Sequence, residues 1–399
     1  MDQQIYNFLA VINTAIRGKP MKLKNPDWER ISAYAKIHNI VPLVYEGCSK
    51  YEIFSKAPIE LRSKYFASSV VSIKEQICRT QVFLDIYNKL LCAGIKPLLL
   101  KGLICRSLYG ELADHRPSRD EDIYIKTEDF NICRNILEQN GFVMEDLDLN
   151  VIPLSELSEI TFLHKSGLVI EVHTSLMDNT NQIRARMNSC LEDVYEDCIT
   201  QELDGRLIYS MSPTKCYLFL FLHLYKHFMY FGVGIRQLLD MLLYGEKYYT
   251  EIDWEKVEEN IRSLSAGKFY ADLLDIGSRY LNFNIKSSFS GNNYSLLLED
   301  IMNAGVFGKA TAERRIGGSM TRAAVNYGRF HYRNLFLPKK KDLMRKYRLT
   351  SIKPIRVPAL WLKRIRRFLR YNFDISLLYK SLRTGRRRIK LLKSYGIIN

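Results

Sequence analysis

The sequence predicts an α+β protein in which a mixed β-sheet core is flanked by helical regions. Helical periodicity dominates residues 1–93 and returns after residue 212, whereas residues 94–211 alternate short apolar strands with helices. The 399 residues, with 47% hydrophobic content, are enough to build a large core. We therefore predict an N-terminal helical region (1–93), a sheet-containing core (94–211), a C-terminal helical domain (212–337) and a basic helical tail (338–399).

The N-terminal region is expected to contain at least three helices. Its first 20 residues, MDQQIYNFLAVINTAIRGKP, have the pattern of an amphipathic helix. In NPDWERISAYAKIHNI, Asn25 is the predicted cap and Pro26 lies in the first turn. The segment VVSIKEQICRTQVFLDIYNKLLCAG predicts a long helix that ends at Gly94.

The spacing of apolar residues changes after residue 94. Short apolar segments predict the strands IKPLLLKG, DEDIYIK, FVMEDLDL, EITFLHK and LVIEVHT, and helical spacing predicts the helices LICRSLYG and TEDFNICRNILEQNG. This alternation favours a small mixed sheet. After Pro213 the pattern is helical again, whereas residues 285–335 show little periodicity and receive no assignment.

The composition argues against several classes of protein. A membrane-spanning helix needs a run of about 18 apolar residues, and the sequence contains none. We recognise no N-terminal signal segment. The eight cysteines form no Cys-x-x-Cys pair, which argues against a zinc knuckle or a disulfide framework. These observations predict a cytoplasmic protein.

Positive charge is concentrated in the tail. Residues 338–399 contain 20 Lys and Arg but 2 Asp and Glu, a net charge of +18, while the whole chain carries +16. We expect the tail to contact an anionic polymer or a membrane surface. An apolar stripe in the tail is expected to pack on the body, and a distal cluster is expected to lie in solvent. The stripe comprises Trp361, Leu362, Ile365, Phe368 and Leu369, and the cluster Arg386, Arg387 and Arg388.

The segment HRPSRDEDIYI, residues 115–125, places a cluster of charges at the start of an apolar strand. Alternate residues of a strand share a face, so Asp120 and Asp122 are predicted to point the same way. Their oxygens suit hard cations such as Mg²⁺. Glu171, in the middle of the apolar strand LVIEVHT, is the predicted third carboxylate because an unpaired acid there would be destabilising.

A second set of residues suits phosphate. Lys101 and Gly102 end a predicted strand just before a helix, where glycine lets the backbone approach an anion and lysine adds a positive charge. Arg116 and Arg119 can pair with phosphate oxygens. Each set alone is also common in ordinary turns, and it is their order along these elements that makes the combination specific.

With these motifs the chain resembles the DNA polymerase β-like nucleotidyltransferases, and most closely their bacterial uncharacterised nucleotidyltransferase group. The segments LLLKGLICRSLYG, RPSRDEDIYI and IEVHTSL carry the resemblance, which extends over about residues 60–370. It implies a polymerase β-like core with two Mg²⁺ ions held by Asp120, Asp122 and Glu171. It also implies attack of an acceptor oxygen on the α-phosphorus of an NTP, with pyrophosphate leaving.

Two positions depart from the pattern of the wider superfamily. Lys101 and Gly102 stand where that superfamily has a Gly-Ser pair. Glu121 stands where an apolar residue is usual, on the strand face opposite Asp120 and Asp122. We expect Glu121 to be exposed or to pair with a nearby arginine.

Further polar residues have competing explanations. His223 and His227 lie four apart on one helix face, and a core or lining position is favoured over a zinc site because the usual glutamate after the first histidine is missing. Arg236 and Asp240 have the spacing of a helix-surface ion pair. The resemblance implies instead that His227 and Arg236 face the cleft and meet the substrate or the triphosphate. His173 is expected to support the acidic cluster rather than to react.

Three functions are compatible with the sequence. The first is an active nucleotidyltransferase whose acceptor is a small molecule, a protein hydroxyl or an RNA end, the last as in toxin-type nucleotidyltransferases. The second is a catalytically idle module that binds nucleotides or polyanions. The third is a nucleic-acid-binding protein that acts through the tail, which has no recognisable motif. The three carboxylates favour the first function, because buried acids without a cation are destabilising.

Overall fold

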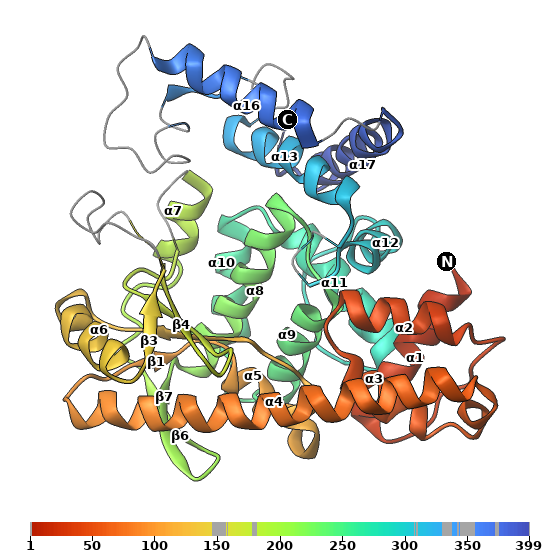
Figure 1. Ribbon diagram of the computed structural model, residues 1–399, viewed down its shortest axis with the longest axis horizontal. Coiled ribbons are helices and arrows are strands. Elements are labelled where there is room, and N and C mark those ends of the chain that lie inside the picture. Colours follow the sequence, from red (N-terminus) through yellow and green to blue (C-terminus); the bar gives the residue numbers. More distant parts are fainter. Residues whose placement is uncertain are drawn as a thin grey trace.

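The computed structural model describes residues 2–145, 157, 159–177, 182–306, 308, 310–328, 337–340, 343, 356–371 and 375–398. Within these residues, a seven-stranded mixed sheet is surrounded by helices, which confirms the α+β class (Figure 1). The main apolar core contains residues from all four predicted parts, such as Ile5, Leu99, Leu222 and Leu392. The division at residues 93, 211 and 337 therefore stays a prediction.

The N-terminal region is helical, as predicted. It contains α1 (Gln3–Arg17), α2 (Trp28–Ile37), α3 (Val41–Ser49), the 3-10 helix η1 (Glu52–Lys56) and α4 (Ile59–Cys92). The cap of α2 is Asp27 rather than Asn25, because the Asp27 carboxylate accepts the backbone N–H of Arg30. The long helix α4 runs along one edge of the molecule, from the N-terminal helices to the sheet (Figure 1).

The sheet has the strand order β3-β4-β5-β2-β1-β7-β6. The strands are β1 (Leu98–Leu99), β2 (Asp120–Tyr124), β3 (Phe142–Met144), β4 (Glu159–His164), β5 (Val169–His173), β6 (Ile199–Leu203) and β7 (Arg206–Ser210). β2 is parallel to β5 and antiparallel to β1, and β1 is parallel to β7. The sequence did not indicate β6 and β7. Residues 146–149 of the predicted strand FVMEDLDL lie outside the described residues.

Short helices connect the strands. They are α5 (Leu103–Ser107), η2 (Gly110–His115), η3 (Thr127–Asp129), α6 (Phe130–Gln139) and α7 (Gln182–Ser189). The helices predicted after Gly102 and after Lys126 are confirmed as α5 and as η3 with α6.

The rest of the described chain is helical. It contains α8 (Pro213–Tyr230), α9 (Ile235–Lys247), α10 (Trp254–Ser263), α11 (Gly267–Leu281), α12 (Tyr294–Ala304), α13 (Ala312–Tyr327), α16 (Val357–Tyr371) and α17 (Ile375–Ser394). Helices α12 and α13 occupy the stretch that showed little periodicity. In the part of the chain that the structure describes, no helix combines the length and apolarity needed to cross a membrane.

The last helix belongs to the folded body. α17 packs along α13, and its Ile389 and Leu392 are part of the apolar core. Arg388 is buried and forms an ion pair with Asp300 of α12. The expectation of a solvated distal cluster is therefore wrong for Arg388, although its neighbours 386 and 387 are exposed.

The predicted stripe of α16 is only partly covered. Trp361 packs against Leu343 and Val357, and its indole N–H donates to the carbonyl of Pro338 at 3.0 Å. Leu362 is 59% exposed, so it does not pack on the body as expected. The side chains of residues 368 and 369 lie outside the described residues.

Candidate active site

The strand register brings the predicted acids together. In the parallel pair β2–β5, Asp122 lies opposite Glu171, with Asp120 two residues earlier on β2 and His173 two residues later on β5. Paired residues of neighbouring strands point to the same face, and so do residues two apart. These four side chains therefore share one face of the sheet. Glu159 of β4 lies opposite His173 and joins them.

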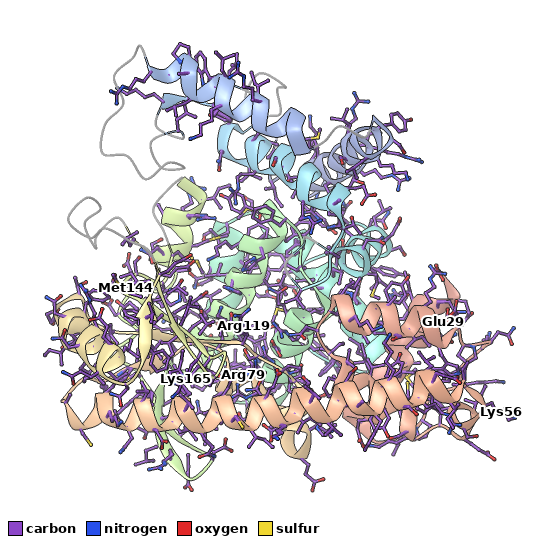
Figure 2. All side chains as sticks on the ribbon, viewed as in Figure 1. Glu29, Lys56, Arg79, Arg119, Met144 and Lys165 are labelled. Carbon is purple, nitrogen blue, oxygen red and sulfur yellow. The ribbon has the colours of Figure 1, made fainter. Side chains whose placement is uncertain are left out.

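This face borders a cavity of about 400 Å³ whose other walls come from α8 and the start of α9. The predicted site residues that line it are Lys101, Gly102, Arg116, Asp120, Asp122, Glu171, His227 and Arg236. Arg119, labelled in Figure 2, is exposed and is not among the lining residues. One cavity thus brings together every predicted site residue except Arg119.

Asp122 is held in its charged form by two neighbours. Lys101 Nζ lies 2.9 Å and His173 Nε2 lies 3.1 Å from its Oδ1. Burial alone would raise the pKa of Asp122, but the charge and hydrogen bonds of Lys101 and His173 outweigh burial and hold that pKa below its ordinary value. Asp122 is therefore ionised at neutral pH.

Glu171 has the opposite electrostatic environment. Burial, and then the negative charge of Asp122, raise the pKa of Glu171 to about 9. At neutral pH, and without a cation beside it, Glu171 keeps its proton. Because metal ligands must be deprotonated, this proton has to leave before Glu171 can bind a cation.

The acidic cluster has the donor atoms of a divalent cation site. One ligand atom each from Asp122, Glu171 and His173 lies within 4.8 Å of the others. Two carboxylates and an imidazole suit a divalent cation, and Asp120 offers another carboxylate on the same face. His173 thus contacts Asp122 directly and is itself a candidate ligand. The number of ions stays a prediction.

A row of nitrogen atoms runs from this cluster along α8. Lys101 Nζ lies 3.1 Å from His223 Nε2, which lies 3.2 Å from His227 Nε2. Burial, followed by nearby lysine ammonium groups, lowers the pKa of both histidines well below the ordinary value, so both imidazoles are neutral. Both histidines line the cavity, which agrees with a lining position, and the potential metal cluster found among the described residues does not include them.

Two arginines border the α9 side of the cavity. Arg116 Nε donates to Asp240 Oδ1 at 2.9 Å, and the Tyr109 hydroxyl donates to the same oxygen at 3.0 Å. Arg236 donates to the carbonyl of Pro117. The expected surface pair between Arg236 and Asp240 is wrong, because both residues are buried and Asp240 pairs with Arg116. Arg116 Nη1 and Arg236 Nε are buried without a hydrogen-bond partner among the described residues.

Comparison with known families identifies the family of the chain. Residues 24–282, more than half of the chain, match the family described as uncharacterised nucleotidyltransferase. The chain belongs to this family. No curated protein and no solved structure matches it. The matched range includes the whole sheet and helices α8 to α11, and it ends before α12.

In this chain, Glu121 explains the need for Gly102. Glu121 is buried, its Oε1 accepts from Arg106 at 2.5 Å, and its Oε2 accepts the backbone N–H of Leu103 at 2.9 Å. The expectation of an exposed Glu121 is wrong, and the alternative of an arginine partner is confirmed. A Cβ on Gly102 would lie 1.8 Å from that Oε2. The start of α5 therefore already holds an anion from the protein itself, and a phosphate contact at Gly102 stays a prediction.

Sequence reasoning missed two charged residues that line the cavity. Lys226 lies on α8 three residues after His223, a spacing that places both on one helix face and that the sequence does show. Burial lowers the pKa of Lys226. Glu159 stands at the start of β4, and only the strand register reveals that it faces the cavity.

Proposed function

We propose that this protein is a Mg²⁺-dependent nucleotidyltransferase with a polymerase β-like core. It moves a nucleoside monophosphate from an NTP to a hydroxyl or phosphate oxygen of an acceptor and releases pyrophosphate. One observation carries the proposal: a single cavity joins the carboxylates of β2 and β5 to basic groups, among them Lys101, Lys226 and Arg236. A magnesium–triphosphate complex presents the complementary charges, because its cations suit the carboxylates and its phosphate oxygens suit the basic groups.

Each wall of the cavity has a separate task in this proposal. Asp120, Asp122 and Glu171, with His173 beside them, hold the cations. Bound Mg²⁺ lowers the pKa of the attacking oxygen's proton and neutralises charge on the phosphates. Lys101, which pairs with Asp122 in the absence of ligand, is available to a phosphate oxygen once a cation has taken its place beside the carboxylate.

The phosphates are assigned to the α8 and α9 walls. His227 is neutral, and its one N–H, which faces His223 Nε2 in the absence of ligand, can turn to a phosphate oxygen when the triphosphate binds. Arg116 Nη1 and Arg236 Nε are donors without a partner among the described residues, and a triphosphate supplies acceptors. The pairing of Arg116 with Asp240 fixes its guanidinium plane before the substrate binds.

Incubation of the protein with Mg²⁺, each common α-labelled NTP and a lysate of its host tests the function. A labelled product identifies the donor and the class of acceptor together. Asp122→Asn should lower transfer on the order of 10³-fold or more, since the carboxylate that lies between Lys101 and His173 in the cation cage is lost. Glu128→Gln, an exposed change shortly after β2, serves as the control and should leave transfer unchanged.

Two results would contradict this assignment. Equal turnover by wild type and Asp122→Asn would separate the reaction from the acidic cluster. Mg²⁺-dependent NTP binding without any labelled product would instead indicate an idle nucleotide-binding module.

A further inference from the structure

Helix α4 exposes large apolar side chains in a regular pattern. Ile59, Phe66, Val70 and Ile77 are 64%, 56%, 48% and 45% exposed. Because an α-helix turns about 100° per residue, these four positions fall within roughly 40° of one another around the helix axis. Together with the half-buried Ile73 they form what we call the α4 stripe, about 27 Å long.

The α4 stripe is not the main face by which the helix packs on its own protein, although the Phe66 ring centroid lies 6.0 Å from that of Tyr45 on α3. That face carries Tyr65, Ser69 and Gln76, which are buried and lie roughly 100° away around the axis. Isolated exposed apolar residues are ordinary, but a continuous row of them marks an interaction surface. The stripe is therefore available to a partner.

The spacing of the stripe is that of a coiled-coil seam. Positions 59, 66 and 73 are spaced seven residues apart. Positions 63, 70 and 77 form a second series with the same spacing, which begins four residues later. These are the d and a positions of a heptad repeat, which suit packing against another helix. One a position, Ser63, is polar.

A second copy of α4, run in the opposite direction, complements the stripe. The antiparallel pairing is centred on residue 68 of both copies. It places Ile59 opposite Ile77 of the second copy, Phe66 opposite Val70, and Ser63 opposite Ile73. Each of these layers joins an a position to a d position. The same two-fold relation makes the surface complementary to itself, as a symmetric dimer requires.

The flanking charges agree with this pairing. In an antiparallel pair the e positions of the two helices lie beside each other, and the e positions here are Glu60, Ala67 and Lys74. All three are exposed. Glu60 of each copy then lies beside Lys74 of the other, and the small Ala67 lies next to its own copy near the two-fold axis.

We propose that two copies of this chain associate through their α4 stripes, antiparallel and about a two-fold axis near Ala67. In Figure 2, the labelled residues Lys56 and Arg79 lie just before and just after this segment of the chain. The surface is formed by α4, outside the cavity-lining residues, so the association does not depend on the proposed reaction.

Matched single substitutions test the surface. Val70→Glu places an acid next to the centre of the seam in both copies, whereas Val71→Glu makes the same change one residue on, 100° away around the helix. Sedimentation equilibrium should give twice the mass of one chain for wild type and Val71→Glu. It should give a single-chain mass for Val70→Glu, with an unchanged circular dichroism spectrum because Val70 is already exposed.

Cysteine and charge-reversal variants test the antiparallel register. The two cysteine variants are made with the exposed Cys78 and Cys92 replaced by serine. Ala67→Cys should form an intermolecular disulfide under mild oxidation, whereas Ser68→Cys, which faces away from the seam, should not. Glu60→Lys should weaken the dimer because it brings like charges together. Adding Lys74→Glu in the same chain should restore it.

Several results would overturn the proposal. A single-chain mass for wild type at tens of micromolar would do so, as would a dimer that Val70→Glu leaves intact. A monomer that binds lipid vesicles through the stripe would identify a membrane as the partner instead. Failure of the Glu60→Lys and Lys74→Glu pair to restore the dimer would exclude this register.

Discussion

Gly102 is confined by a neighbouring side chain of the same protein. Its φ is 60°, and a Cβ would collide with Glu121. Gly110 is a matched control, because its φ is 57° and no atom lies within 4 Å of its Cβ position. Gly102 also has a ψ of −108°, outside the left-handed helical region, so an alanine there meets additional backbone strain as well as the collision with Glu121.

We predict that Gly102→Ala lowers the free energy of unfolding by about 1 to 3 kcal/mol more than Gly110→Ala does. Urea denaturation of the two variants measures the difference. If Gly102→Ala weakens NTP binding while its stability equals that of Gly110→Ala, then contact with phosphate rather than with Glu121 explains the glycine.

His38 ties the N-terminal helices to the start of α9. Its Nδ1 accepts the backbone N–H of Ile235 at 3.3 Å, which requires an unprotonated nitrogen. Burial lowers the pKa of His38 to about 3, and the charges of Arg236 and Arg314 act in the same direction. The folded-state pKa thus lies below the unfolded value of about 6.5.

It follows that acid destabilises the fold through His38. His38 binds a proton more tightly in the unfolded chain than in the folded one. Its contribution to the free energy of unfolding is therefore fully present above about pH 6.5 and is lost as the pH falls toward 3. Between pH 6.5 and 5 we expect wild type to lose roughly 2 kcal/mol of stability relative to His38→Gln. Parallel pH profiles of the unfolding free energy for the two proteins would contradict this assignment.

At the scale of elements, local patterns predicted the strands that carry the acids but not the edge of the sheet. β2 and β5 were recognisable because apolar residues lie between their charged residues. The hairpin β6–β7 was missed because its strands, ITQEL and RLIYS, are rich in polar residues. The Asp204-Gly205 turn between them, with both residues at positive φ, was the available signal.

Pairings between distant elements could not be predicted from local patterns. The spacing of Arg236 and Asp240 indicated a pair within one helix. Asp240 in fact pairs with Arg116, 124 residues away, because α9 packs with its charged side facing inward. Similarly, the row of nitrogen atoms from Lys101 to His227 depends on how α8 lies against the sheet.

The C-terminal end of α8 is completed by residues far along the chain. The last carbonyls of a helix lack partners within it. Here Arg388 donates to the carbonyl of Phe228, and Thr321 Oγ1 donates to that of Tyr230 at 2.6 Å. Arg388 also pairs with the buried Asp300. Helices α13 and α17, outside the range matched to the family, thus support the helix that carries His223 and His227.

Arg388→Met tests this support. We predict a loss of about 2 to 4 kcal/mol in the free energy of unfolding, because Asp300 keeps only Arg314 and a helix-end carbonyl loses its donor. Arg387→Met, a change in the exposed neighbour, should stay within about 0.5 kcal/mol of wild type. Equal urea midpoints for the two variants would show that the buried contacts of Arg388 contribute little.

At the scale of the whole molecule, charge is divided unevenly between tail and body. The tail carries +18, and α17 contains no acidic residue. Four of its exposed basic residues share one helix face: Lys380, Arg383, Arg387 and Lys390. From this division we expect the tail to be the source of any long-range attraction for polyanions.

We expect binding to single-stranded RNA to fall by about tenfold or more between 50 and 200 mM salt, because phosphate contacts release counterions. Changing the four exposed basic residues of α17 to glutamine should reduce both the affinity and its salt dependence. Fluorescence anisotropy with labelled RNA measures both. Affinity that does not change with salt would contradict an electrostatic role for the tail.

The distance along the chain between Phe228 and Arg388 also sets an order of events during synthesis. Their contact spans 160 residues. At about 5 to 20 residues per second, translation takes roughly 8 to 32 s to cover that length. During this interval the nascent α8 already carries its histidines, while its carbonyl end still lacks the donors that α13 and α17 bring. We therefore expect the α8 wall of the candidate cavity to mature only after α17 has left the ribosome, so that slow translation of the tail should delay NTP transfer rather than formation of the sheet.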